Sequence, residues 1–297
     1  MSIVEQVQNR VTSLQEEGQG EGLWKWIIYL PPVLFITLLF LVPVSLMTIT
    51  SVYPDFIGVE EAGLTFRFYQ EALDSVYLDA LWRSIWYAGA TTLISLLLGY
   101  PVVYAAVKVF KKYEVPILLL SVLPFWVMYL VRMFGWIAIL KTGGLLDDMG
   151  SLLGLELDFL YSAPAVVIGL VFSWYPLMVF PLYASVRSLD DSFLEASKDL
   201  GANSYRTFRR ITIPETKSGI LAGSVLVFVP SFGSYVTPLL LGGPNSSQML
   251  ATIIGRQFSE SFNWPLGAAL GTIMVIIVLG CLVVVQRYAT VVEVEGQ

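Results

Sequence analysis

Histidine is absent from this 297-residue chain, and cysteine occurs once, at Cys281. Without histidine there can be no His-based general base, catalytic triad, HExxH zinc site or histidine ligand for haem. One cysteine excludes an internal disulfide and a CxxC metal site. No GxxxxGK[ST] motif occurs either, so the chain has no P-loop to hold ATP phosphates. These absences exclude the histidine, cysteine and P-loop kinds of site, and we expect a chain that is not an enzyme and that binds neither a cofactor nor a metal itself.

Charge is also scarce. Charged residues make up 13% of the chain and hydrophobic residues 56%, whereas soluble domains carry about 25% charged residues. The mean hydropathy is +0.72. A net charge of −6 and no basic stripe argue against nucleic acid as a partner. The composition predicts a polytopic protein embedded in a lipid bilayer.

Long uncharged windows mark the predicted membrane spans, since a spanning helix needs about 20 apolar residues. Six such windows follow the N-terminal tail 1–22, and a short C-terminal tail, 291–297, comes after them. We therefore expect an all-α membrane domain over 23–290. Its six transmembrane helices are predicted at about 27–50, 84–107, 115–140, 163–186, 218–241 and 264–286.

The lysines and arginines predict the orientation of these spans. Of the 17, 12 fall in the tails and the loops on the N-terminal side, six of them in the loop 187–217. Four fall on the opposite side, and Arg132 lies within a span. Because cytoplasmic loops carry the excess of basic residues, both termini are expected in the cytoplasm of a multi-pass plasma-membrane protein.

Carboxylates are missing from all six predicted spans. Transporters coupled to protons or cations usually keep a carboxylate inside the membrane. A stand-alone channel or secondary carrier is therefore a weaker hypothesis, although the spans alone do not exclude it. A polytopic membrane enzyme is a third hypothesis, with serine or tyrosine chemistry as its remaining option.

The loop 187–217 has the pattern of two short helices joined at a glycine. Ser192 followed by Glu195 has the spacing of a capping box, so a helix is expected to start at Ser192. Gly201 follows Leu200 and can take the left-handed conformation that ends a helix. A second helix is expected after it, capped by Asn203 or Ser204.

This loop resembles the "EAA" loop of ABC importer permeases, written E-A-A-x3-G-x9-I-x-L-P. Five of the seven fixed positions match, and Ser197 and Ile213 replace an alanine and a leucine. The resemblance implies a coupling helix that docks on a separate ATP-hydrolysing subunit, so that ATP would be bound by a partner. The coupling residues it implies are Glu195, Ala196, Ser197, Gly201, Ile211 and Pro214.

Further segments resemble the spermidine/putrescine class of these permeases: LLLGYP (96–101), LPFW (123–126), LVRMFGW (130–136), YVTPLLLGGP (235–244) and NWPLGAAL (263–270). The resemblance implies the type I importer (MetI-like) fold with two ATP-binding cassette subunits, a second, homologous permease and an extracytoplasmic solute-binding protein. The solute would be spermidine, putrescine or a related amine. Polyamine permeases often carry an acid near the YV-x segment, and residues 235–238 have none. An opine, an amino-acid derivative or another small organic solute therefore stays open.

Aromatic rings in the spans are candidates for lining a pathway, because they can hold an ammonium group by cation–π contact at about 0.5–2 kcal/mol each. Arg132 has the opposite character, since its charge repels a cation. For each of these residues, packing or a lipid-facing role is an equally simple interpretation. The candidates for the pathway are Trp126, Tyr129, Arg132, Trp174, Tyr175, Tyr235 and Thr237.

Overall fold

The computed structural model describes residues 28–54, 63–151, 154 and 159–294, and within these ranges every regular element is a helix. The predicted N-terminal tail, 1–22, lies outside the described residues, as do residues 295–297 of the predicted C-terminal tail 291–297. Residues 291–294 of that tail are helical instead. A single isolated bridge pairs Tyr161 with Gly242. The predicted all-α class is confirmed.

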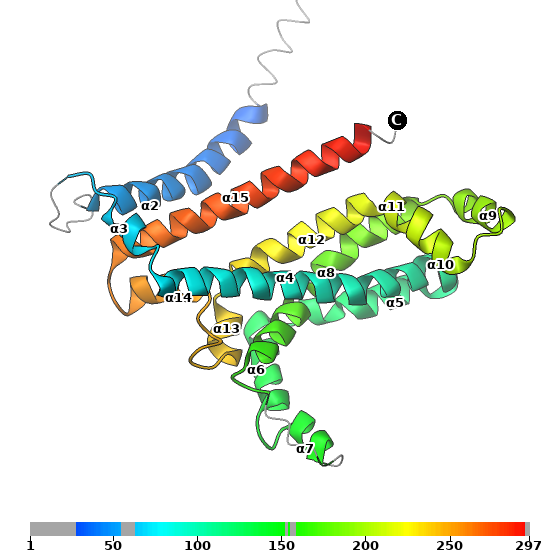
Figure 1. The fold of residues 1–297 in the computed structure, drawn as a ribbon, viewed down its shortest axis with the longest axis horizontal. Coiled ribbons are helices and arrows are strands. Elements are labelled where there is room, and N and C mark those ends of the chain that lie inside the picture. The colour runs from blue at the N-terminus through cyan, green and yellow to red at the C-terminus, as the bar shows by residue number, and fades with distance from the viewer. Residues whose placement is uncertain (1–27, 55–62, 152–153, 155–158, 295–297) are drawn as a thin grey trace, which may run out of the picture.

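The first helix runs over Ile28–Val52 and contains the π-helical segment η1 (Thr37–Leu41) and α2 (Val42–Val52). It packs along the last helix, α15 (Trp264–Val294), at one edge of the molecule (Figure 1). The short α3 (Arg67–Glu71) closes this corner against both. The N-terminal and C-terminal spans are therefore neighbours.

Three helices form the centre of the bundle: α4 (Ser75–Tyr104), α8 (Ala163–Ser188) and α12 (Lys217–Phe232). Glycines let α12 approach α8 closely. A Cβ added at Gly219 would lie 2.6 Å from the Pro181 carbonyl oxygen, and one at Gly223 would lie 2.6 Å from Met178 Sδ. Gly219 and Gly223 have the GxxxG spacing that membrane helices use for such contacts.

The remaining helices link the central helices to one another and, after α12, to α15. The chain leaves α4 through η3 (Ala105–Val109) and η4 (Lys111–Tyr113) into α5 (Glu114–Val122), and continues as η5 (Leu123–Trp126), α6 (Tyr129–Leu140) and α7 (Leu145–Ser151). After α8 come α9 (Asp191–Asp199), α10 (Ser204–Thr207), η6 (Phe208–Thr212) and α11 (Ile213–Glu215). After α12 come α13 (Val236–Leu241) and α14 (Leu250–Ser259), which leads to α15. In Figure 1, α9 and α10 lie at the end of the bundle opposite α3.

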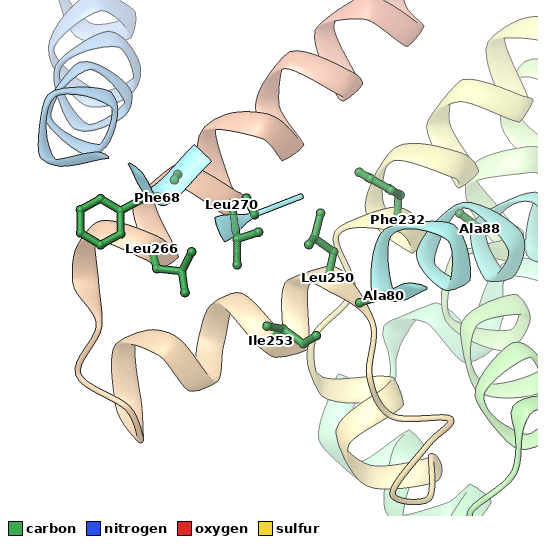
Figure 2. Packing of buried hydrophobic residues seen from close by; sticks show 10 residues of the cluster. Phe68, Ala80, Ala88, Phe232, Leu250, Ile253, Leu266 and Leu270 are labelled. Atoms are coloured by element: carbon green, nitrogen blue, oxygen red, sulfur yellow. The ribbon is translucent and has the colours of Figure 1, made fainter. Parts of the chain in front are cut away.

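One apolar cluster joins the central helices to the outer pair (Figure 2). It gathers buried side chains from α3, α4, α12, α14 and α15, and α14 stands between α4 and α15. Burial of each large aliphatic or aromatic side chain contributes about 1.5–3 kcal/mol. The labelled members are Phe68, Ala80, Ala88, Phe232, Leu250, Ile253, Leu266 and Leu270.

Helix α4 starts at Ser75, before the predicted 84, and α15 continues to Val294, past the predicted 286. Two further predicted spans are not single helices. The range 115–140 is not one helix, because Val127 and Met128 are extended between η5 and α6. The range 218–241 is also broken, since α12 ends at Phe232 and α13 starts at Val236. Among the described residues, five helices are long and apolar enough to cross a membrane, and the 16-residue α12 is a shorter apolar helix beside them.

Candidate functional site

The helix α9 begins at Asp191, not at Ser192 as the capping-box spacing predicted. Asp190 is its N-cap, and its Oδ1 accepts a hydrogen bond of 2.9 Å from the Ser192 amide. That bond also lowers the pKa of the Asp190 carboxyl. Glu195 therefore sits in the middle of α9, exposed to solvent, and closes no capping box. Asp and Ser are comparable N-caps, and here the earlier residue takes the role.

The predicted glycine turn is present at the end of α9. Gly201 has φ +75°, and its amide donates to the Lys198 carbonyl at 2.9 Å. Asn203 then caps α10, because its Oδ1 accepts a 2.8 Å hydrogen bond from the Arg206 amide. Of the two caps that the sequence offered, Asn203 is the one used. Helix, glycine and helix follow in the predicted order.

Side chains fasten the two short helices to each other and to α4. The hydroxyls of Ser197 and Thr207, both buried, lie 2.6 Å apart and join α9 to α10. Phe208 meets the ring of Tyr100 edge-on, with ring centroids 5.5 Å apart. The Tyr100 hydroxyl pairs with that of Thr216 at 2.8 Å, just before α12. The serine that replaces an alanine of the EAA pattern thus makes a bond that an alanine cannot make.

The outer side of this loop is apolar where solvent would favour polar groups. Leu200 is 88% exposed, Tyr205 70% and Phe193 52%. Of the predicted coupling residues, Ser197 is buried and Ile211 is half-buried. The other four are exposed: Glu195, Ala196, Gly201 and Pro214. Exposed apolar side chains on one short loop are typical of a surface that contacts another protein or a membrane.

Ion pairs that the sequence did not reveal tie the start of α9 to the turn between α4 and α5. Lys108 Nζ lies 2.7 Å from Asp191 Oδ1, and Lys111 Nζ lies 2.8 Å from Asp191 Oδ2. These bonds, that of Lys108 foremost, lower the pKa of the Asp191 carboxyl to about 2. Lys108 also donates to the Leu189 carbonyl at 2.7 Å. Asp191 and Lys108 are 83 residues apart in sequence, so no local sequence pattern predicts this ion pair.

Four of the seven predicted pathway residues lie together where α6, α8 and α13 meet. The Tyr129 hydroxyl is hydrogen-bonded to that of Thr237, and the Tyr129 ring lies 6.2 Å from the ring of Trp174. The guanidinium carbon of Arg132 lies 5.6 Å from the rings of both Tyr129 and Phe125. Arg132 is buried, and its Nε and Nη1 find no hydrogen-bond partner among the described residues.

The other three predicted pathway residues lie elsewhere. Trp126 is 87% exposed at the end of η5. Tyr175 lines an apolar cavity of about 460 Å³ together with Pro124 and Trp136. Tyr235 packs against Gly255 of α14 and lines a separate apolar cavity of about 600 Å³ beside α15. The structure therefore gathers one polar–aromatic group and leaves these three rings outside it.

Comparison with known proteins gives a family and close relatives. Residues 23–293 match the family described as binding-protein-dependent transport system inner membrane component. The spermidine/putrescine transport system permease protein PotB of Haemophilus influenzae is 38% identical over 210 residues, which cover 69% of this chain and 73% of that protein. PotB of Escherichia coli is 37% identical over 225 residues, covering 75% of this chain and 81% of PotB.

Solved structures share the fold at low sequence identity. A bacterial ABC transporter involved in the import of the acidic polysaccharide alginate has a chain that matches with a TM-score of 0.71 at 16% identity. The match covers 93% of this chain and 99% of that one. A chain of the MetNI methionine ABC transporter matches with a TM-score of 0.55 at 13% identity, over 72% of this chain and 95% of the other.

Proposed function

This chain belongs to the family of binding-protein-dependent transport system inner membrane components, and from that premise we propose that it is one permease subunit of an ABC importer for a small organic amine. Membership places it among multi-pass membrane components of transport systems and not among enzymes. We propose a plasma-membrane location with both termini in the cytoplasm. ATP would be bound by two partner subunits, and a homologous second permease and an extracytoplasmic solute-binding protein would complete the importer.

One observation carries the coupling role: the helix–glycine–helix loop presents Phe193, Leu200 and Tyr205 to solvent. We assign this surface to docking on an ATP-hydrolysing subunit, with Glu195, Ala196, Gly201 and Pro214 exposed along the same loop. Ser197 and Ile211 are buried or half-buried, so their proposed part is to hold the loop in shape.

The amine class is supported by the relatives at 37–38% identity, which are named for spermidine and putrescine transport. The group of Tyr129, Trp174 and Thr237 offers ring faces and a hydroxyl, which suit an ammonium group. We propose these residues, with Arg132, as the pathway-lining group. Trp126, Tyr175 and Tyr235 lie away from these residues, and we leave them out of the pathway-lining group.

One feature favours a second substrate class, a solute that carries a carboxylate, such as an opine or an amino-acid derivative. The Nε and Nη1 groups of Arg132 and the Nε1 of Trp174 are buried donors without a partner among the described residues. A carboxylate accepts hydrogen bonds from such donors, whereas an ammonium group does not.

The test is uptake by the complete importer reconstituted in proteoliposomes. Radiolabelled spermidine and putrescine are offered together with ATP inside the vesicles and the binding protein outside. We expect accumulation that stops when ATP or the ATPase subunits are omitted. Competition by unlabelled amines and by carboxylated amino-acid derivatives separates the two substrate classes. Uptake that continues without ATPase subunits would contradict the importer assignment and favour a stand-alone carrier.

A further inference from the structure

The carboxylate of Asp191 lies between the helix–glycine–helix loop and the turn that joins α4 to α5. It is on the first residue of α9, the helix that bears the proposed docking surface. Its partners, Lys108 and Lys111, lie in η3 and η4, the turn that joins α4 to α5. One residue therefore connects the docking loop directly to two helices of the bundle.

Other contacts lie away from the start of α9. Phe208 packs on Tyr100 and Tyr104 of α4, and Tyr183 and Arg187 of α8 bond Glu114, the first residue of α5. Cavities of about 390 and about 460 Å³ flank the Asp191 ion pairs, and Lys108, Lys111 and Asp191 line both. The Lys108 bond to the Leu189 carbonyl reaches the residue before the N-cap of α9. These contacts of α9 to the turn thus concentrate at its start, with a cavity on either side of them.

The turn leads into the irregular part of the bundle. From η4 the chain runs through α5 and η5 to the extended residues Val127 and Met128, and then to α6. Tyr129 and Arg132 are on that helix. The path from the α4–α5 turn to Tyr129 and Arg132 therefore consists of α5, η5 and one break.

We infer that Asp191 is a positioning residue for energy coupling: through Lys108 and Lys111 it carries the movement of α9 into the α4–α5 turn. This inference rests on the proposed function, since it assumes that a partner moves α9. The competing path is the backbone, because Leu189 and Asp190 alone separate α8 from α9. If the backbone carried the movement, the ion pairs would add only stability.

Their contribution to stability is small, which makes the two roles separable. The Asp191 side chain is 47% exposed and that of Lys111 is 63% exposed, although that of Lys108 is 9% exposed. An exposed ion pair such as Asp191–Lys111 contributes little to stability. The buried Lys108 keeps its hydrogen bond to the Leu189 carbonyl when the carboxylate is lost. Loss of the carboxylate should therefore leave the fold and the assembled importer in place.

The experiment compares Asp191→Asn with Asp190→Asn in the complete importer, and measures solute uptake and ATP hydrolysis in the same proteoliposomes. Asp191→Asn removes the charge that meets the lysines. Asp190→Asn removes a charge one residue away but keeps the cap, because Asn caps helices as well as Asp does. The quantity compared is uptake per ATP hydrolysed, in complexes that retain their ATPase subunits.

We expect uptake per ATP to fall at least about fivefold in Asp191→Asn, the lower end of usual coupling between sites. It should stay near the wild-type value in Asp190→Asn and recover largely in Asp191→Glu, which restores a carboxylate. Lys111→Gln should lower it less than Asp191→Asn, because the bond to Lys108 remains, and it serves as the second variant should Asp191→Asn assemble poorly.

Uptake per ATP that is unchanged in Asp191→Asn and Lys111→Gln would overturn the inference, even where total uptake falls with the amount of complex. An equal fall in Asp190→Asn would do the same, because it would reduce the effect to local charge. A wild-type importer without ATP-dependent uptake would instead contradict the proposed function, so the two failures are distinct.

Discussion

At the scale of single residues, Gly201 is the position where the backbone itself decides the shape of the proposed docking loop. Its φ of +75° is a conformation that side chains with a β-carbon adopt at a cost of about 1–2 kcal/mol. No atom lies within 4 Å of the place where a Cβ would be, so a substitution meets strain but no clash. The effect of a mutation here can therefore be assigned to the turn alone.

We predict that Gly201→Val impairs or abolishes ATP-dependent uptake while expression and membrane insertion stay near normal. The strained turn should change the angle between α9 and α10, and ATPase subunits should co-purify less well with the variant. Uptake assays on proteoliposomes and the amount of retained ATPase measure both effects.

Gly201→Asn is the matched control, because Asn tolerates positive φ better than other residues that carry a Cβ. It should lose much less uptake than Gly201→Val. Full transport by Gly201→Val, with normal retention of the ATPase, would show that this loop is not the coupling element.

At the scale of helices, the contact of α12 with α8 depends on two residues without side chains, Gly219 and Gly223. A methyl group at Gly219 meets the Pro181 carbonyl oxygen, which is backbone and cannot rotate away. At Gly89 of α4, by contrast, no atom lies within 4 Å of an added Cβ. Gly219 and Gly89 thus allow the same substitution to be compared in crowded and in open surroundings.

We predict that Gly219→Ala destabilises the protein by about 1–3 kcal/mol, the usual cost of overpacking a close contact. Gly89→Ala should be neutral or slightly stabilising, because Ala favours helix over Gly by about 1 kcal/mol. Thermal unfolding of the two variants in detergent gives the comparison. Equal midpoints for Gly219→Ala and wild type would mean that α12 and α8 are not held at this distance.

Helix ends and breaks show what could be predicted from the sequence and what could not. Gly201 and Asn203 were foreseen because turns and caps follow local rules that a few neighbouring residues decide. The start of α9 was misplaced, since Asp190 and Ser192 are both good caps and only packing selects between them. The break at Val127 was invisible, because hydropathy measures how apolar a segment is and not whether it is one helix. The pairing of Asp191 with Lys108 depends on tertiary structure alone.

At the scale of the whole molecule, basic residues gather at the end of the bundle that carries α9 and α10. Lys108, Lys111 and Arg187 lie there, together with the arginines of α10 and η6. Arg67 and Arg83 belong to α3 and the first turns of α4, at the other end (Figure 1). The arrangement in space thus agrees with the orientation proposed from the sequence.

We predict that cysteines placed at Asp74 and Asp148 react with a membrane-impermeant maleimide added to intact cells, whereas cysteines at Lys112 and Ser204 do not. All four positions are exposed, so the outcome reports the side of the membrane and not burial. Cys281 is replaced by serine in the background. The cysteines at Lys112 and Ser204 should be labelled once the cells are permeabilised. Labelling of Ser204→Cys in intact cells would contradict this topology.

The break between η5 and α6 also limits what can surround this chain in a bilayer. The first amides of α6 lack acceptors within the helix, and the N-cap, Met128, makes no side-chain hydrogen bond to them. Yet Trp126 and Met128 are 87% and 67% exposed in the single chain. Hydrocarbon cannot satisfy free amides, so this face must meet water or another protein. In deuterated solvent, the amides at this break should exchange faster than those of α4 or α8. The break would then be a water-accessible strip on a surface that otherwise faces lipid.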